Sequence, residues 1–420
     1  MRNDPFQITD ALYGDVRFPP PIADLARRPL MQRLRQVRLS NIDSLDMPGI
    51  ANISRFEHSL GAAYLASKVG FSSGLDERET LILQAAALIH DTAITPFGHL
   101  VEEALQYVKA DFNHEVKWSV LLSDATRLNE LGGIDTQIFM GRSSGLREWA
   151  AKIFGGNGPR FLGVILDAIQ GRGKFGQCIA SDLDLDNLDN LTRIAFHMGL
   201  RPDPELPIRL SESMSVVEED GEVSFEQSAI DDIKAWSRLR HSVYEHLMPA
   251  PADFCGKLML LFSTVEAFRN GVLDRTTSWM LTDSDFVHRL RHSDLANIRE
   301  TVERWLIADL WDSTELMWFR GPVPSLPEIL SFVEQISRTL GRQCFGYRIK
   351  DKRNRQINIR LISGSRVKLG QNSDSWLFGV ASPVRKPFVS EDLRKISRLV
   401  EEAFGATGAP ANRVEAALFE

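Results

Sequence analysis

The 420-residue sequence contains few of the features that mark exported or membrane-spanning proteins. Only three cysteines occur, Cys178, Cys255 and Cys344, and their spacing fits neither a disulfide framework nor a zinc-binding motif. No uninterrupted apolar run approaches the roughly 18 residues that a membrane span needs. Residues 1–10 also lack a basic segment followed by an apolar one. These absences predict a cytoplasmic protein without a membrane anchor.

The chain also lacks an excess of positive charge. It has 49 basic and 56 acidic residues and a net charge of −7, which disfavours sequence-independent binding to nucleic acid or an anionic membrane. A local basic groove is compatible with these numbers. The best candidate is segment 27–38, with Arg28, Arg33 and Arg35, which would suit a polyanionic small ligand equally well. Hydrophobic residues make up 43% of the chain, which predicts a sizeable core.

Most of the sequence has the apolar periodicity of helices. Segment 81–105 begins with an apolar run, reaches His90 and Asp91, and continues to His99 and Glu102. The apolar run predicts a helix buried on most sides, and a further helix after Pro96 is expected to carry His99 and Glu102 on one face. Burial of an imidazole and a carboxylate at the end of the buried helix is costly unless something pairs with them. A divalent metal ion would be a suitable partner.

Two more predicted helices supply donors of the same kind. One begins after Ser54 and carries His58, and the other covers 184–197 and carries Asp186. Together with His90 and Asp91 they form a mixed nitrogen and oxygen set, which suits Mn, Fe, Zn or Mg better than a closed structural zinc site. Taken singly, each residue is typical of a hydrogen-bonded core side chain or a helix cap. The prediction of a metal centre therefore depends on the set.

Four blocks, RFEHSLG, IHD, PFGHLVEE and DLDLDNLD, occur in this order and carry the donors. In these blocks the chain resembles the HD-domain phosphohydrolases, and within them the deoxynucleoside triphosphate (dNTP) triphosphohydrolases. The resemblance extends from about residue 8 to about Leu290. It implies a mostly α-helical HD fold and a metal-dependent release of deoxynucleoside and triphosphate. It also implies a homo-oligomer, a nucleotide substrate, and the option of a nucleotide activator.

The resemblance implies roles for further residues. His99 with Glu102 is similar to the family's catalytic histidine–carboxylate pair, although the family carries aspartate at the position of Glu102. His114 resembles a second histidine near the leaving group, and Arg55 resembles an arginine that contacts phosphate. The role of Arg55 also has a chemical basis, because a guanidinium is well suited to bind a phosphate.

The chain departs from the family where the substrate would be contacted. At positions that carry polar contacts in the family it has Leu39, Ile94, Asn187, Asn190 and Ile194, whereas Tyr244 is retained. Asn187, Asn190 and Tyr244 are therefore the candidate substrate contacts. The loss of these polar contacts leaves two alternative functions open. One is hydrolysis of a monophosphate, a cyclic nucleotide or another phosphoester, and the other is a nucleotide-sensing regulatory protein without chemistry.

The residue pattern changes near Gly321 from helical periodicity to one that includes β-rich runs, and this change predicts the domain organisation. Residues 1–320 are expected to form the helical HD unit with an N-terminal segment facing the substrate, 321–408 a small α+β unit, and 409–420 a tail. Within the first unit we expect a helix over 29–39 and helical structure throughout 228–268. Prolines and acidic residues in 202–222 predict an exposed excursion.

Overall fold

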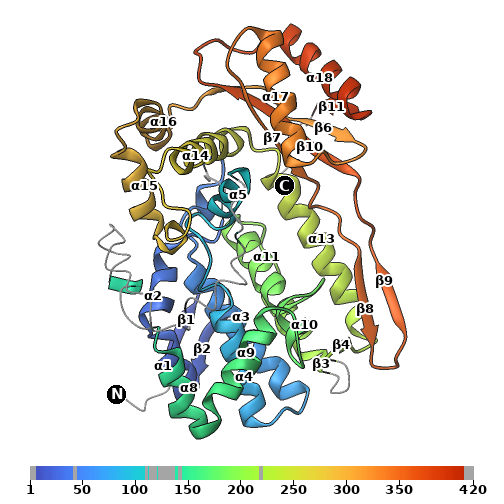
Figure 1. Cartoon of the computed structure of the whole chain (residues 1–420). Helices are drawn as coiled ribbons and strands as arrows, with labels where there is room; N and C mark the ends of the chain where they lie inside the picture. Colours follow the sequence, from blue (N-terminus) through green and yellow to red (C-terminus); the bar gives the residue numbers. More distant parts are fainter. Residues whose placement is uncertain are drawn as a thin grey trace.

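The computed structural model describes residues 6–40, 45–108, 112, 121, 138–140, 144–216 and 221–410. Most of this part of the chain is helical, as the sequence predicts (Figure 1). The α-helices are α1 (Pro20–Ala26), α2 (Pro29–Arg33), α3 (Arg55–Ser72), α4 (Glu77–Ile89), α5 (His99–Tyr107), α8 (Leu146–Phe154), α9 (Gly158–Ile169), α10 (Gly176–Ile179), α11 (Leu185–His197), α12 (Glu205–Glu212), α13 (Ala229–Leu247), α14 (Pro251–Arg269), α15 (Asp283–Arg291), α16 (Ala296–Leu306), α17 (Leu326–Leu340) and α18 (Ser390–Phe404).

Three of these helices begin at polar residues that act as N-caps. Ser54, Asp76 and Asp184 each accept a hydrogen bond from a backbone N–H in the first turn of α3, α4 and α11, respectively. Each cap satisfies one of the N–H groups that a helix start leaves without an intrahelical partner. The predicted starts of α3 and α11 are confirmed.

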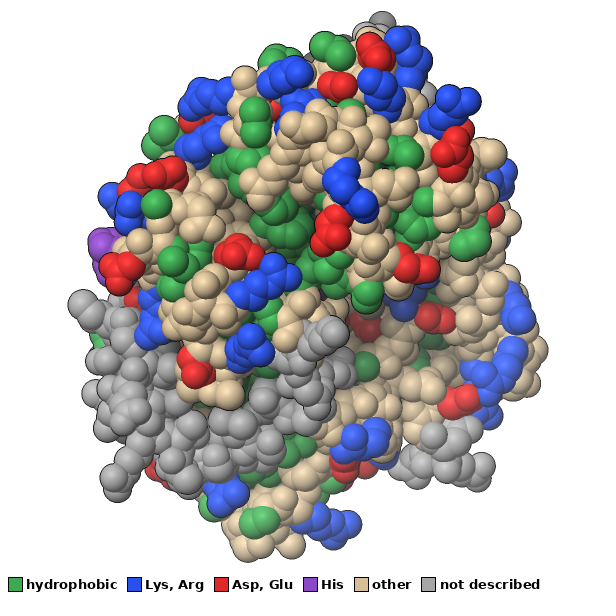
Figure 2. Space-filling view, turned by 45° about the horizontal axis from the view of Figure 1, so that its top comes forward, with side chains coloured by type: hydrophobic (Ala, Val, Ile, Leu, Met, Phe, Trp, Pro, Cys, Tyr) green, Lys and Arg blue, Asp and Glu red, His purple; other side chains and the backbone are tan. Residues whose placement is uncertain are grey.

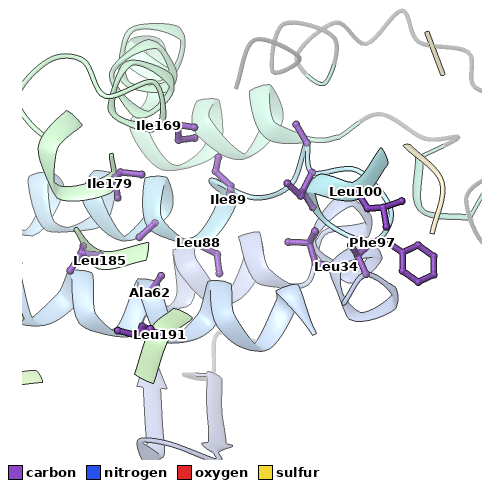
Figure 3. Packing of buried hydrophobic residues seen from close by; sticks show 14 of the residues in the cluster. Leu34, Ala62, Leu88, Ile89, Phe97, Leu100, Ile169, Ile179, Leu185 and Leu191 are labelled. Atoms are coloured by element: carbon purple, nitrogen blue, oxygen red, sulfur yellow. The ribbon is translucent and has the colours of Figure 1, made fainter. Parts of the chain in front are cut away.

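The central helices α3 and α4 pack against each other, with α11 and α12 against α3 and α9 against α4. Figure 3 shows Leu88 and Ile89 of α4 between Ala62 of α3 and Ile169 of α9. The three consecutive alanines of α4, at 85–87, are fully buried. Their small side chains allow the close approach of neighbouring helices that the apolar run predicts.

Strands form three sheets in the described chain. They are β1 (Phe6–Asp10), β2 (Gly14–Phe18), β3 (Met214–Val216), β4 (Val223–Phe225), β5 (Asp312–Ser313), β6 (Met317–Arg320), β7 (Phe345–Lys350), β8 (Ile357–Leu361), β9 (Arg366–Leu369), β10 (Ser375–Ser382) and β11 (Thr407–Pro410). β1 and β2 are an antiparallel hairpin, and β10 pairs antiparallel with β5, β6 and β7, while β11 adds to β6. Side chains of α17 and α18 pack on this larger sheet in a small core of their own.

The third sheet links the C-terminal region to the helical body. β8 pairs in parallel with β4, Ser224 opposite Arg360, although more than a hundred residues separate the two strands in sequence. Figure 1 shows the β8–β9 arm running beside α13 towards β3 and β4. Ile357 and Ile359 of β8 belong to the main core. The predicted boundary between the units 1–320 and 321–408 stays a prediction. The pairing of β8 with β4 joins residues from both sides of that boundary.

Two expectations about element boundaries are wrong. The helix expected over 29–39 ends at Arg33, since Val37 is extended and its carbonyl accepts the backbone N–H of Arg55. The helical structure expected over 228–268 is confirmed as α13 and α14, with a break at 248–250 that contains Pro249. The excursion 202–222 contains α12 and β3 rather than only a loop.

Two of the three arginines named for the basic groove in segment 27–38 are engaged within the protein, whereas the third, Arg35, is exposed and lines a pocket with Arg38. Arg33 is fully buried, and its guanidinium donates to the backbone carbonyls of Thr92, Ile94, Trp279, Met280 and Leu281. Arg28 pairs with Asp24 and Glu148. Figure 2 shows one face of the molecule, on which basic and acidic side chains are intermixed rather than segregated. None of the helices in the described ranges is long and apolar enough to cross a membrane.

Candidate metal centre and active site

His58 lies in the first turn of α3, fully buried and fixed by a carboxylate. Its Nδ1 lies 2.7 Å from Oδ2 of Asp189 on α11. The pairing makes Nδ1 the protonated nitrogen, so Nε2 carries the lone pair. The capped start of α3 therefore presents one metal-binding nitrogen towards α11.

His90 follows the last residue of α4, and its ring is also fixed through Nδ1. Its Nδ1 lies 2.8 Å from the carbonyl oxygen of Ala87, one turn earlier in the same helix. Nδ1–H donates to that oxygen, which leaves the Nε2 lone pair of His90 free to bind a cation. The two imidazole rings stand edge to face, 5.2 Å apart between centroids.

Asp186 and Asp91 bring carboxylate oxygens to the same point. Oδ1 of Asp186 lies 2.9 Å from Nε2 of His58 and 3.7 Å from Nε2 of His90. Oδ2 of Asp91 lies 3.8 Å and 3.6 Å from these two nitrogens. Residues separated by more than a hundred positions in sequence thus converge on one small volume.

The three inner donor atoms fit a bound cation. Nε2 of His58, Nε2 of His90 and Oδ1 of Asp186 lie within 4.8 Å of one another. Each of these atoms is buried, and none has a hydrogen-bond partner among the described residues. Buried polar atoms are normally paired, so a shared set of unpaired acceptors requires a positive ligand. Two imidazoles with carboxylates suit Mn, Fe, Zn or Mg.

Behind His58 lies a buried ionic network that the sequence indicates only in part. Arg193 donates to both oxygens of Asp189, at 2.9 and 3.0 Å, and also pairs with Asp10 at 3.1 Å and Glu57 at 2.6 Å. A Cβ atom at Gly61 of α3 would overlap the Asp189 carboxylate and the Arg193 guanidinium. The lack of a side chain at Gly61 is therefore what lets α11 approach α3 at the site.

The donor set also has strongly shifted pKa values in the absence of a cation. Burial disfavours the charged form of His90, but Asp91 and Asp186 outweigh burial and raise its pKa to about 9. Burial likewise opposes ionisation of Asp91, yet the charges of Arg55 and His90 hold its pKa well below the usual range. Burial and the charge of Asp186 raise the pKa of Asp184, the cap of α11, to about 7. A metal ion must therefore displace a proton from His90.

Arg55 is buried next to the donor set and holds one of its members. Its Nη1 lies 2.7 Å from Oδ2 of Asp91, and its Nη2 and Nε donate to the carbonyls of Leu39 and Arg38. A guanidinium has five N–H donors, so two remain for a phosphate. Gly98 packs against Arg55, with φ of 59°, and a Cβ there would lie 2.8 Å from Nη2. The start of α5 therefore lies beside Arg55.

His99 is the first residue of α5 and pairs with Glu102 as the sequence predicts. Its Nδ1 lies 2.9 Å from Oε2 of Glu102, and the His99 side chain is 56% exposed while that of Glu102 is 13% exposed. The carboxylate selects the tautomer in which Nδ1 of His99 carries the proton and Nε2 carries the lone pair. His114, the third predicted catalytic residue, lies outside the described residues.

The three candidate substrate contacts are in different situations. Asn187 donates through Nδ2 to Asp184, which makes it part of the α11 cap. Asn190 has a buried Oδ1 without a partner among the described residues. Tyr244 packs with Ile194 against a small apolar cluster that contains Leu39. Leu39 and Ile194, two of the apolar residues at positions that are polar in the family, therefore belong to the same cluster as Tyr244.

Comparison with known proteins agrees with the geometry. The family model described as the HD domain matches residues 55–140, a range that contains His58, His90, Asp91 and His99. A crystal structure of a phosphohydrolase from Bacteroides thetaiotaomicron superimposes with a TM-score of 0.63 over 90% of this chain and 100% of that one. At 19% identity this likeness establishes the fold.

Two relatives extend the sequence match beyond the HD segment. The metal-dependent phosphohydrolase cns2 of Cordyceps militaris is 26% identical over 319 residues, covering 72% of this chain and 78% of that protein. A homolog of the deoxynucleoside triphosphate triphosphohydrolase SAMHD1 in Dictyostelium discoideum is 25% identical over 263 residues, covering 59% of this chain and 47% of that protein. The chain spans about half the length of the first curated relatives that it matches.

These findings and the donor geometry define the class of the site: residues 55–140 match the HD domain, and most of the chain is similar to a metal-dependent phosphohydrolase. Within that class the chain is similar to the deoxynucleoside triphosphate triphosphohydrolases.

Proposed function

We propose that the protein hydrolyses a dNTP to deoxynucleoside and triphosphate, with a divalent metal ion held by His58, His90, Asp91 and Asp186. The observation that carries the proposal is the group of buried, unpaired donor atoms on His58, His90 and Asp186. Similarity to dNTP triphosphohydrolases suggests the substrate. When bound, the metal would act as a Lewis acid on a phosphate oxygen.

The chain's own residues prepare this site for a phosphate. Asp189 and the Ala87 carbonyl hold the two imidazoles in the tautomer that presents Nε2. Arg55 fixes Asp91 and offers its two remaining N–H groups to the phosphate. Binding and orientation of the phosphate are thus supplied by groups that are already in place before the substrate arrives.

His99 is the proposed proton-transfer group and Glu102 its positioning residue. Glu102 fixes Nδ1–H of His99, which leaves Nε2 to take or return a proton at the scissile P–O bond. His114 is proposed to serve near the leaving group. A His99→Gln variant should lower kcat by about 100-fold or more with little change in KM, since proton transfer contributes about that factor. An unchanged kcat would remove His99 from the mechanism.

The direct test is product analysis. Purified protein is incubated with each dNTP and either Mn or Mg, and the deoxynucleoside and triphosphate are separated by chromatography. A His90→Ala variant should lose activity and metal, whereas His288→Ala, an exposed histidine on α15, should retain both. If the metal-loaded wild type releases neither product from any dNTP, the assignment of the substrate is wrong.

A second candidate is hydrolysis of a different nucleotide or phosphoester. It is favoured by the apolar character of Leu39 and Ile194, because neither side chain can hydrogen-bond a sugar hydroxyl. A substrate screen separates the two candidates. Turnover of monophosphates or cyclic nucleotides without turnover of dNTPs would select the second.

A further inference from the structure

A cavity of about 430 Å³ lies between α14, α16 and the C-terminal sheet. α14 packs against α16 and also contacts β5 and β7 of that sheet. Figure 1 shows α14 and α16 at the end of the helical body that faces β7. The residues that line the cavity do not include any of the metal donors. A ligand bound there would therefore be independent of the proposed hydrolase function.

One wall of the cavity is aromatic. It is formed by Phe262 of α14, Trp311 in the segment before β5, and Phe345 of β7. The centroid of the Phe345 ring lies 4.5 Å from that of Phe262 and 4.8 Å from that of Trp311. Small-molecule sites typically have volumes of about 300–1,000 Å³ and apolar or aromatic walls. The cavity thus offers a contact surface for a flat, apolar group.

Two buried polar atoms belong to the residues that line the cavity. Oγ of Ser263 and Nε1 of Trp311 have no hydrogen-bond partner among the described residues, and these side chains are 4% and 6% exposed. Buried polar groups are normally hydrogen-bonded, so such atoms beside a cavity indicate a polar ligand. Because Nε1 of tryptophan can only donate, a ligand that satisfies it must carry an acceptor.

The charges at the cavity favour a positive ligand. Glu300 of α16 is exposed and forms no ion pair within the described chain. Glu266 of α14 pairs with Arg269 at 2.8 Å. Arg304, a cationic lining residue, is held by the Asp309 carboxylate at 3.1 Å and by backbone carbonyls. The charge that is left for a ligand is therefore the Glu300 carboxylate, which would pair with a cation.

We propose that this cavity binds a small organic cation, in which a protonated amine and a hydrogen-bond acceptor lie at opposite ends of a flat apolar body. The apolar body would lie against the aromatic wall. The amine would pair with Glu300 at the exposed side, and the acceptor would reach the buried donors at Ser263 and Trp311. This site is additional to the proposed active site.

The test uses small probes that share a benzene ring. Tyramine carries an ammonium group and a phenol hydroxyl. Tyrosol has a hydroxyl in place of the ammonium, desaminotyrosine has a carboxylate there, and phenethylamine lacks the phenol hydroxyl. Binding of each probe to the whole chain is measured by calorimetry at pH 7.

Three variants locate the site. Glu300→Gln removes the charge, and Glu303→Gln, an exposed glutamate one turn later on α16, is its matched control. Thr301→Trp introduces a large side chain at a half-buried lining position and fills the cavity. Thermal unfolding verifies that each variant folds. If Thr301→Trp does not fold, the comparison of Glu300→Gln with Glu303→Gln decides.

The wild type should bind tyramine about two- to fivefold more tightly than tyrosol, and desaminotyrosine should not bind detectably. Phenethylamine should bind about two- to tenfold more weakly than tyramine, because it has no hydroxyl for the buried polar atoms. Glu300→Gln should abolish the preference for tyramine and leave the affinity for tyrosol unchanged. Glu303→Gln should keep the preference, and Thr301→Trp should lose binding of every probe.

Several results would overturn the site. Equal affinity of the wild type for tyramine and tyrosol, or tighter binding of desaminotyrosine, contradicts a cationic ligand. Undiminished tyramine binding by folded Thr301→Trp places the probe elsewhere, and failure of every probe to bind leaves the cavity without this role. His90→Ala should bind tyramine as the wild type does, so loss of hydrolysis and loss of the cavity ligand are measured separately.

Discussion

Replacement of Asp189 by asparagine should weaken metal binding without removing a metal ligand. Asp189 is fully buried and its Oδ2 fixes Nδ1–H of His58. An asparagine offers one carbonyl oxygen and one NH₂ group in place of two acceptor oxygens. Its NH₂ group would face either the Arg193 guanidinium or the His58 ring, and in the second case the proton of His58 moves to Nε2, where the metal binds.

The expected loss can be worked out from these contacts. Removal of a partner that orients a ligating histidine typically costs 10- to 100-fold in metal affinity. At saturating metal this corresponds to about 1.4–2.7 kcal/mol less stabilisation of the folded state by metal. The metal-free protein should also lose about 1–3 kcal/mol, because Arg193 keeps Asp10 and Glu57 as partners but loses its pair with Asp189.

Glu57→Gln is the matched control. Glu57 pairs with Arg193 at 2.6 Å, as Asp189 does at 2.9 Å, whereas among the described residues the ion pairs of the His58 ring are with Asp91, Asp186 and Asp189. Metal affinity is measured by competition with a chelator, and stability by denaturant unfolding with and without metal. Glu57→Gln should lower stability and leave metal affinity unchanged. If both variants weaken metal binding equally, or if Asp189→Asn binds metal as tightly as the wild type, the proposed role of Asp189 in orienting His58 is wrong.

Three further outcomes are expected. Because the pKa of metal-free His90 is raised to about 9, metal affinity should rise with pH and level off above pH 9. At pH 7 the affinity should be about 100-fold weaker than its value above pH 9. A flat affinity profile from pH 7 to 9 would contradict this expectation. Gly61→Ala should weaken metal binding and cost about 1–3 kcal/mol through overlap with Asp189, whereas Gly163→Ala on α9, where a Cβ meets nothing, should be neutral or stabilising in the same chelator and unfolding assays. Arg33→Met should lower the free energy of unfolding by about 3–5 kcal/mol, since it leaves buried carbonyls unpaired; a loss below 1 kcal/mol would show that these carbonyls find other partners.

The parts of the fold that the sequence predicts are those that local chemistry determines. Ser54, Asp76 and Asp184 are cap residues next to apolar periodic segments, so the starts of α3, α4 and α11 can be read directly. The parallel pairing of β4 with β8 cannot be read in this way. Its partners are distant in sequence, and neither strand carries a local signal for the other.

The same distinction applies to the site. His58, His90 and Asp186 could be proposed from their ordered blocks, and the structure brings their donor atoms together. The pairing of Asp189 with Arg193 has a weak signal, because opposite charges four residues apart share one helix face. Asp10 has no such signal. It reaches Arg193 only because the β1–β2 hairpin, which the sequence analysis did not predict, packs beside α11.

The apolar departures near the site are consistent with one another. Leu39 lies after α2 and Ile194 on α11, and both belong to the cluster that Tyr244 joins. A polar residue at either position alone would place a hydrogen-bonding group against apolar neighbours, with a cost of about 1–3 kcal/mol for the unpaired group. The two positions are therefore expected to be polar together or apolar together. In this chain both are apolar, so under the proposed function a substrate group at this cluster would be held by surface complementarity rather than by hydrogen bonds within the cluster.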